Sequence, residues 1–178
     1  MNEYHPASSP AEQHRREAPK SVACRIITVS DTRTPETDAS GRLVRELLER
    51  QGHAIADYRI VRDDYEGIRA LLRKAAADPA TDAVLLNGGT GIARRDTTYE
   101  AVKSLLEKEM PGFGEIFRML SFTEDIGSAA ILSRAVAGTI GRTAVFSMPG
   151  STGAVRLAMT RLVVPELGHA VRELRKDK

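Results

Sequence analysis

The fold is indicated most directly by the stretch Asn87-Gly88-Gly89-Thr90-Gly91-Ile92-Ala93-Arg94-Arg95-Asp96-Thr97-Thr98. It follows the apolar run 83–86, which is typical of a buried strand, and it precedes 99–102, which is typical of the start of a helix. Glycines let backbone N–H groups approach a phosphate, and a helix N-terminus adds positive potential. We therefore expect the backbone of Gly88, Gly89, Thr90 and Gly91 to bind a phosphate.

Two familiar phosphate-binding motifs do not fit this loop. A P-loop would need a lysine directly after the last glycine, but the next lysine after Gly91 is Lys103. A dinucleotide-binding loop would need a glycine where Arg94 stands, and it would follow the first strand rather than the third. An ordinary tight turn remains open as the alternative.

The pattern around the loop predicts an α/β fold. Apolar runs predict strands over 22–29 and 83–86, and we expect a second strand between them over 54–61. Apolar stripes at helical spacing separate them, from Leu43 to Leu48 and from Ile68 to Ala76. Strands that alternate with amphipathic helices favour a mostly parallel sheet covered on both faces. Ligands of such sheets bind at the carboxyl ends of the strands, so the segments after Val29, Val61 and Leu86 are candidate positions.

The second half of the chain continues the same pattern. Residues 143–148 predict a strand, and Gly141 before it predicts a turn. A final helix should begin after 149–153, and Pro165 should break or kink it. Earlier, Phe113, Phe117 and Leu120 share one helical face. That face could pack in the core or form an oligomer contact.

Composition excludes several functional classes. The chain has 26 basic and 24 acidic residues, interspersed, for a net charge of +2, which argues against nucleic-acid binding. It has no apolar run near eighteen residues and no signal-like start, so we expect a cytoplasmic protein without a membrane anchor. The single Cys24 fits a small core residue in a reducing compartment. Residues 1–20 predict a disordered tail and residues 21–178 a single domain.

Two carboxylates follow predicted strands at the ligand edge, Asp63 and Asp96. Together they could hold Mg²⁺, which binds through oxygen ligands and bridges to phosphates. Each also has a structural alternative. Asp63 with Glu66 could cap the second helix, and Asp96 could cap the helix after the loop, where Thr97 and Glu100 also match a capping box.

Three further segments are candidates for lining the same pocket. They are the turn Ser30-Asp31 after the first strand, the turn Pro149-Gly150-Ser151 before the last helix, and Ser133-Arg134. Each again has a plainer alternative. The turns could be simple turns with a helix cap, and Arg134 could form a structural ion pair. Arg134 could equally bind a phosphate or a carboxylate through two hydrogen bonds.

Six motifs follow one another along roughly residues 22–170: Val29-Ser30-Asp31, Asp38-Ala39-Ser40-Gly41, Gly88–Gly91 with Arg95-Asp96, Pro111-Gly112-Phe113-Gly114-Glu115, Leu132-Ser133-Arg134-Ala135 and Met148–Ser151. This ordered set resembles the MoaB/MogA family of molybdenum cofactor biosynthesis. The Phe113–Phe122 segment and the Met148-Pro149-Gly150-Ser151 turn are closer to the MoaB branch.

The resemblance implies a three-layer α/β/α fold and a homotrimer or homohexamer. It implies Mg-ATP-dependent adenylylation of molybdopterin, which releases pyrophosphate, and possible contacts with other cofactor-biosynthesis proteins. Asp96 and Asp63 match the family's two catalytic aspartates, and both would hold Mg²⁺. Some MoaB members have Glu at the second position and are inactive, so a non-catalytic molybdopterin-binding paralogue is the alternative. Ser151 stands where active relatives often have Asn.

Overall fold

Six strands form one mixed sheet in the order β2-β1-β3-β6-β5-β4. The computed structural model describes residues 17–176. β2, β1, β3 and β6 run parallel, while β5 pairs antiparallel with β6 and β4 pairs antiparallel with β5. The strands are β1 (Ala23–Val29), β2 (Ala54–Val61), β3 (Ala83–Asn87), β4 (Lys108–Glu109), β5 (Val136–Ile140) and β6 (Thr143–Met148).

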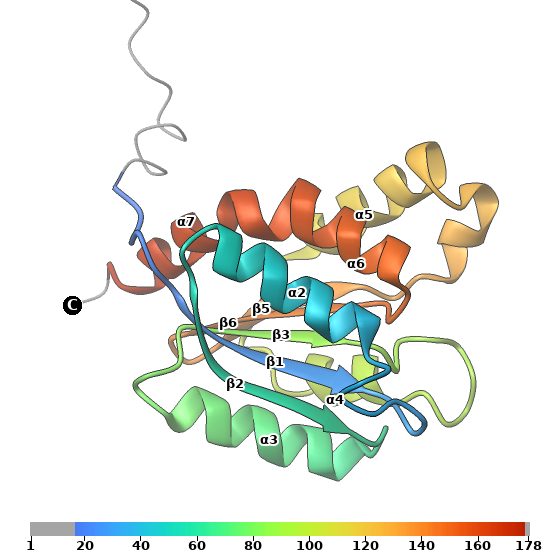
Figure 1. The fold of residues 1–178 in the computed structure, drawn as a ribbon, viewed down its shortest axis with the longest axis horizontal. Coiled ribbons are helices and arrows are strands. Elements are labelled where there is room, and N and C mark those ends of the chain that lie inside the picture. The colour runs from blue at the N-terminus through green and yellow to red at the C-terminus, as the bar shows by residue number, and fades with distance from the viewer. Residues whose placement is uncertain (1–16, 177–178) are drawn as a thin grey trace, which may run out of the picture.

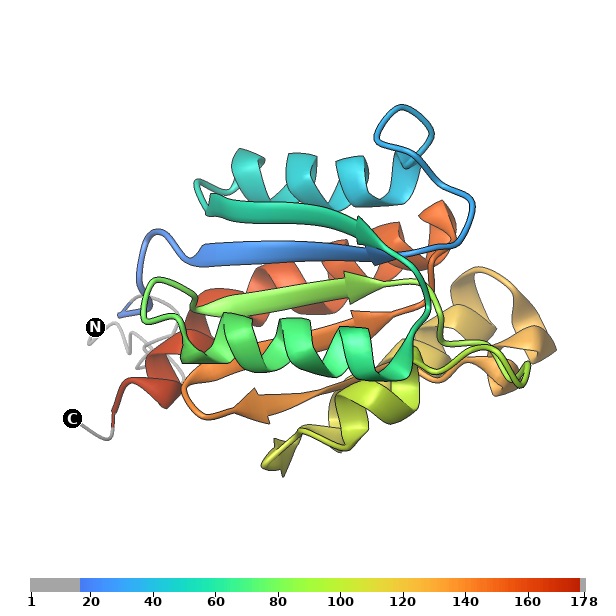
Figure 2. The ribbon, with the colours of Figure 1, turned by 90° about the horizontal axis from the view of Figure 1, so that it is seen from below.

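Helices cover both faces of the sheet, which confirms the predicted α/β/α layers (Figure 1). α2, α5, α6 and α7 lie on one face and α3 and α4 on the other. Figure 2 shows the same sheet from below, with the loops after β1 and β3 at one end. The helices are α2 (Ala39–Arg50), α3 (Tyr65–Ala77), α4 (Thr98–Lys103), α5 (Pro111–Glu124), α6 (Thr152–Ala158) and α7 (Val164–Leu174), with a 3-10 helix η1 (Gly127–Leu132) and a π-helix η2 (Met159–Val163).

The central strands are apolar because both of their faces are covered. All five residues of β3 are buried. Along β1, Cys24 and Ile26 join the core beneath α2, α6 and α7, whereas Ile27 and Val29 join the core beneath α3 and α4. Burial raises the pKa of the Cys24 thiol to about 12, so this residue is a small core side chain, as the sequence predicts.

The short strands β4 and β5 were not predicted from the sequence. β4 has only two residues, both charged and exposed. β5 contains Gly138, and glycine weakens a strand pattern. The structure gives the reason for that glycine: a Cβ at position 138 would overlap the carbonyl oxygen of Lys108 on β4. Gly138 therefore permits the close approach of the edge strand.

The final helix is interrupted near Pro165, as predicted. The π-helix η2 separates α6 from α7, and Pro165 lies in the first turn of α7. Proline lacks a backbone N–H, so the regular α-helical hydrogen bonds are interrupted here, and the Val164 N–H before it donates to the Met159 carbonyl in the wider π-helical pattern. The chain therefore continues in nearly one direction along the sheet (Figure 1).

The aromatic face of α5 packs in the core rather than at the surface. Phe113 and Phe117 are buried, and Phe113 meets Phe146 edge-on with ring centroids 5.5 Å apart. Several large apolar side chains of α5, of η1 and of Ile126 between them are instead exposed. We call these residues the apolar patch: Ile116, Met119, Phe122, Ile126, Ile131 and Leu132.

The predicted tail falls largely outside the described residues, which begin at Glu17. The last part of that segment contacts α7: the Glu17 carboxylate pairs with Arg172, and Ala18 lies beside Gly168. Within residues 17–176, none of the helices has both the length and the apolar character that a membrane span requires.

Candidate functional site

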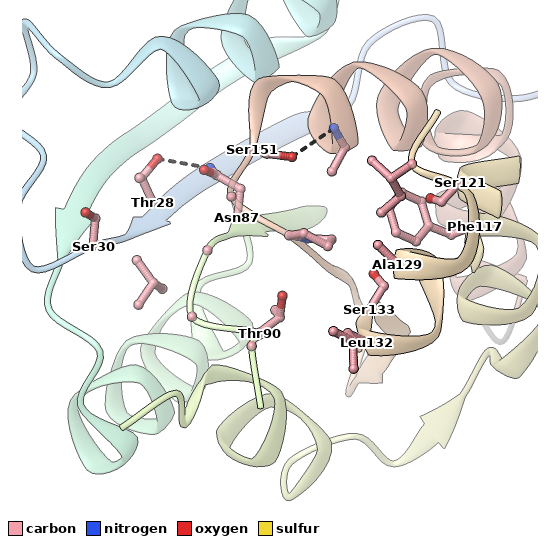
Figure 3. A pocket seen from close by; sticks show the side chains of 18 of the residues that line it. Thr28, Ser30, Asn87, Thr90, Phe117, Ser121, Ala129, Leu132, Ser133 and Ser151 are labelled. Atoms are coloured by element: carbon pink, nitrogen blue, oxygen red, sulfur yellow. Dashed lines mark hydrogen bonds between the residues drawn. The ribbon is translucent and has the colours of Figure 1, made fainter. Parts of the chain in front are cut away.

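A cavity of about 580 Å³ lies at the carboxyl ends of β1, β3 and β6. Figure 3 shows Thr28 and Ser30 of the β1 end on one side, and Phe117, Ala129 and Leu132 of α5 and η1 on the other. The cavity is therefore at the edge that the sequence predicts for a ligand. The predicted binding residues that line it are Ser30, Gly88, Gly89, Thr90, Gly91, Ser133, Pro149, Gly150 and Ser151.

Glycines bring three segments of the cavity wall into contact. Gly88 and Gly89 have φ of 101° and 63°, a region that favours glycine. A Cβ at Gly88 would overlap the carbonyl oxygen of Val29 at the end of β1. A Cβ at Gly150 would lie 3.0 Å from the Cα of Gly88. The glycine loop thus packs closely between the end of β1 and the 149–151 turn. The Gly88 N–H donates to the carbonyl of Met148 at 3.1 Å, so it is not available for the predicted phosphate.

Asp63 connects the end of β2 to the far side of the glycine loop. Its Oδ1 accepts hydrogen bonds from the backbone N–H of Thr97 (3.1 Å) and the hydroxyl of Thr97 (2.7 Å). The capping alternative for this residue is wrong, because the cap of α3 is Asp64, which accepts from the Gly67 N–H at 2.7 Å. Asp63 therefore belongs to the site edge rather than to α3.

Asp96 closes the glycine loop on itself. Its Oδ2 accepts a hydrogen bond from the Ala93 N–H at 3.0 Å, and it lies against Gly91, where a Cβ would come within 2.5 Å. The capping alternatives for α4 are not supported either. The N-cap of that helix is Thr97, and its side chain makes no capping hydrogen bond.

The two aspartates offer a fit for Mg²⁺. The second carboxylate oxygen of Asp63, Oδ2, is buried and has no hydrogen-bond partner among the residues that the structure describes. It points at Gly89 in the loop that Asp96 closes. Within residues 17–176, no group of three or more His, Cys, Asp or Glu side chains is arranged to hold a metal ion. Mg²⁺ commonly uses one or two carboxylates and completes its shell with water and substrate phosphate, so two aspartates are compatible with it.

Arg134 lies behind the glycine loop and not in the cavity wall. Its Nε donates to the carbonyl of Thr90 at 3.1 Å, and its Nη2 donates to the carbonyls of Gly91 and Asp96. It also forms an ion pair with Glu100. These contacts occupy the guanidinium with the loop's own carbonyl groups, so in this structure Arg134 fixes the shape of the loop.

The turn after β1 is ordered by its own polar groups. Ser30 Oγ accepts from the Arg33 N–H at 3.1 Å, and the Ser30 N–H donates to the carbonyl of Val61 at 2.8 Å. Asp31 lies outside the cavity lining, with its Oδ1 3.4 Å from the N–H of Asp63. Ser151, on the opposite turn, caps α6 by accepting from the Ala154 N–H at 3.2 Å. The predicted cap at Ser151 is confirmed, and the residue lines the cavity as well.

Several residues that line the cavity were not predicted from the sequence. Among the described residues, Arg33 is the basic one of this group. Arg33 lines the cavity and its Nη1 pairs with Asp38 at 3.2 Å. Arg33 lies only four residues after the end of β1, so its position at the ligand edge could have been predicted from the sequence. Phe117, Ser121 and Leu132 also line the cavity, but they come from α5 and η1. No sequence pattern indicates that these helices fold over the edge of the sheet.

Asp38 is fully buried next to this wall. It accepts from the Gly41 N–H at 2.9 Å, the Ser40 hydroxyl at 3.1 Å and the Tyr58 hydroxyl. Burial acts to raise the pKa of Asp38, but hydrogen bonds from Thr28, Tyr58, Gly41 and Ser40 together outweigh it and leave the pKa below its usual value. Asp38 is therefore ionised at neutral pH and is a fixed negative charge beneath Arg33.

Comparison with known proteins identifies a consistent set of relatives. Residues 25–169 match a family model described as "Probable molybdopterin binding domain". Molybdenum cofactor biosynthesis protein B of Halalkalibacterium halodurans is 66% identical over 167 residues, which cover 94% of this chain and 98% of that protein. A crystal structure of a molybdenum cofactor biosynthesis protein B superimposes with a TM-score of 0.87 at 59% identity, covering 89% of this chain and 99% of the other. A structure of MogA superimposes with a TM-score of 0.77 at 29% identity, covering 85% and 99%.

Proposed function

The chain belongs to the MoaB/MogA family of molybdenum cofactor biosynthesis proteins, and from that membership we propose that it adenylylates molybdopterin with Mg-ATP. The observation that carries the proposal is the carboxylate of Asp63. Its Oδ2 is buried without a partner and points at the glycine loop that Asp96 closes. An unpartnered buried carboxylate oxygen is costly, and a cation bound with the substrate would satisfy it.

The reaction joins two phosphates. An oxygen of the terminal phosphate of molybdopterin attacks the α-phosphorus of ATP, and a new P–O bond forms. The bond from the α-phosphorus to the β-phosphate oxygen breaks, and its electron pair leaves with pyrophosphate. A phosphate nucleophile is already ionised at neutral pH, so the protein needs no strong base. The barrier consists chiefly of bringing two anions together in line.

The chain's own residues can supply that positioning. The backbone N–H groups of Gly89, Thr90 and Gly91, three residues that line the cavity, could bind phosphate oxygens, whereas the Gly88 N–H already donates to the carbonyl of Met148 at 3.1 Å. Asp63 and Asp96 would hold Mg²⁺, which supplies charge neutralisation and polarises a phosphoryl oxygen. Arg134 holds the carbonyls of the loop outside the cavity, so the N–H groups of the loop are kept in one arrangement. The 149–151 turn and Ser133 complete the wall on the far side of the loop.

The assay with purified protein, ATP, Mg²⁺ and molybdopterin tests this function. We expect pyrophosphate release that depends on both molybdopterin and Mg²⁺. Tight molybdopterin binding without pyrophosphate release would instead assign the chain as a non-catalytic molybdopterin-binding protein. Asp63 favours the enzyme, because the carboxylate that the reaction requires is present and reaches the loop.

We propose that the chain is a homo-oligomer, a trimer or a hexamer, assembled through the apolar patch. Six large apolar side chains of α5, of η1 and of Ile126 between them are 45% to 82% exposed. The two helices are in contact with each other, and large apolar side chains exposed together on neighbouring elements favour an interaction site in a soluble protein. Light scattering at micromolar concentration should give at least three times the mass of one chain, and Phe122→Glu should lower that mass. A monomeric wild type would contradict the proposed homo-oligomer but not the proposed adenylyl transfer.

We also propose that the protein acts in the cytoplasm, where its relatives' pathway would supply molybdopterin. Cys24 is a free and buried thiol, which suits a reducing compartment. Other cofactor-biosynthesis proteins are the expected partners, because molybdopterin must be received from the enzyme that makes it and passed to the enzyme that uses the product.

A further inference from the structure

We propose that Arg33 binds a phosphate group of the ligand in the cavity, and that the buried carboxylate of Asp38 is the positioning residue that holds Arg33 there. The inference rests on the proposed function, because it concerns the phosphorylated substrates of the same cavity. It adds a side-chain contact to a site otherwise built from backbone N–H groups and two aspartates.

The first observation is the place of the guanidinium. Of the described residues 17–176, Arg33 is the only lysine or arginine that lines the cavity. Its Nη2 donates to the carbonyl of Gly150 at 3.3 Å, so the head group lies against the turn opposite the end of β1. Its side chain is 31% exposed, which leaves part of it accessible to a ligand.

The second observation concerns the N–H bonds of the guanidinium. It has five, and three hydrogen bonds are formed within the protein. Nη1 donates to Asp38 at 3.2 Å and to Ser40 at 2.6 Å, and Nη2 donates to Gly150. Among residues 17–176, no acceptor lies within hydrogen-bonding distance of the Nε–H and of one N–H of Nη2. Two donors on one planar group match two oxygens of a phosphate.

The third observation is that Asp38 does not need Arg33 for its own hydrogen bonding. Its oxygens already accept from Ser40, from the Gly41 N–H and from Tyr58. A fully buried carboxylate with these partners is satisfied without a further ion pair. Because Asp38 is fixed on all sides, its pair with Arg33 fixes the arginine instead. A preorganised arginine loses little side-chain entropy when it binds an anion.

The ligand chemistry is therefore a phosphate with two accessible oxygens. Either the terminal phosphate of molybdopterin or a phosphate of ATP would supply it. Both ligands would enter the same cavity in the proposed reaction, and binding measurements with each ligand alone distinguish the two sources.

The test compares Arg33→Met with wild type by isothermal titration calorimetry, using ATP with Mg²⁺ in one series and molybdopterin in the other. We expect the Kd of one of these ligands to rise by about 10- to 100-fold, as for loss of a charge-assisted hydrogen-bond pair. The ligand that is weakened identifies the phosphate. Arg42→Met is the matched control, since Arg42 binds the backbone carbonyls of Pro35 and Glu36 and lies outside the cavity lining. Unchanged Kd values for both ligands in Arg33→Met would overturn the proposal.

A double-mutant cycle tests the positioning role of Asp38. Asp38→Asn should weaken the same ligand as Arg33→Met, and the double variant should be no weaker than Arg33→Met alone, because the two residues act on one contact. Melting temperature is measured in parallel. If the two losses simply add, or if Asp38→Asn weakens both ligands equally while lowering the melting temperature, Asp38 is structural and its positioning role is refuted.

The outcomes separate this inference from the proposed function. A wild type that binds ATP and molybdopterin without releasing pyrophosphate contradicts adenylyl transfer, yet the binding series still tests Arg33. A wild type that turns over, with kcat and KM unchanged in Arg33→Met, contradicts the Arg33 contact alone. A wild type that binds neither ligand contradicts both.

Discussion

Asp96→Ala is expected to abolish measurable pyrophosphate release, with kcat lowered by about 100-fold or more. The substitution removes one of the two carboxylates proposed to hold Mg²⁺. It also removes the acceptor of the Ala93 N–H, which closes the glycine loop. Both losses affect the same step, because the loop must present its N–H groups to phosphate while the cation neutralises that phosphate. Initial rates at saturating ATP and molybdopterin measure the effect.

Asp96→Asn distinguishes the effect of the negative charge of Asp96 from its effect on the shape of the glycine loop. The amide keeps an oxygen that can accept from the Ala93 N–H, so the loop should stay closed while the negative charge is lost. We expect Asp96→Asn to be nearly as inactive as Asp96→Ala, with a melting temperature close to that of wild type. Full activity in Asp96→Asn would mean that the charge is not required, and the carboxylate–magnesium mechanism would then be wrong.

Asp63→Ala is expected to lower kcat by about 10- to 100-fold, a large loss but smaller than that at Asp96. Asp63 reaches across from the end of β2 and accepts two hydrogen bonds from Thr97, the residue after Asp96. Its other oxygen is the buried atom that has no partner. Removing the side chain therefore costs a ligand of the cation and loosens the segment that carries Asp96. The rate should recover in part at high Mg²⁺ concentration, which a titration of the rate against Mg²⁺ would show.

Asp64→Ala is the matched control for this substitution. Asp64 is the next residue, it is exposed, and its carboxylate caps α3 through the Gly67 N–H. Its loss should cost about 1 kcal/mol of stability, as for other N-caps, and leave kcat unchanged. Asp63→Asn should retain the acceptor for Thr97 but not the charge. If Asp64→Ala were the inactive variant and Asp63→Ala the active one, the assignment of the second carboxylate would be wrong.

Much of the fold follows from local patterns along the chain. The positions of β1, β3 and β6 are visible as apolar runs, because a strand buried on both faces must be apolar almost throughout. β2 was also predicted, over 54–61, although it is an edge strand in which no residue is fully buried. β4 and β5 carry no such pattern. β4 has two exposed charged residues, and β5 depends on Gly138, whose role is clear only when Lys108 is placed beside it.

Part of the candidate site was likewise predictable from local patterns, and part was not. The glycine loop, Ser30 and the 149–151 turn were predictable, since each directly follows a strand and the carboxyl ends of parallel strands meet at one edge. The separate roles of Asp63 and Asp64 were not predictable from the sequence. Both residues suit a helix cap, and only the approach of Thr97 from a segment 34 positions away distinguishes them.

Local sequence patterns do not predict where the side chains of Arg33, Asp38 and Arg134 lie. The sequence specifies the strands, the helices and the edge at which a ligand binds, because burial patterns and turns depend on residues that are neighbours in the chain. Which arginine faces the cavity depends on contacts between distant segments. Arg134 lies behind the loop because the carbonyls of Thr90 and Gly91 turn toward it. Arg33 lies in the cavity wall because Asp38 and the Gly150 carbonyl hold it there. Such side-chain directions arise only when the sheet assembles and brings these groups within hydrogen-bonding distance.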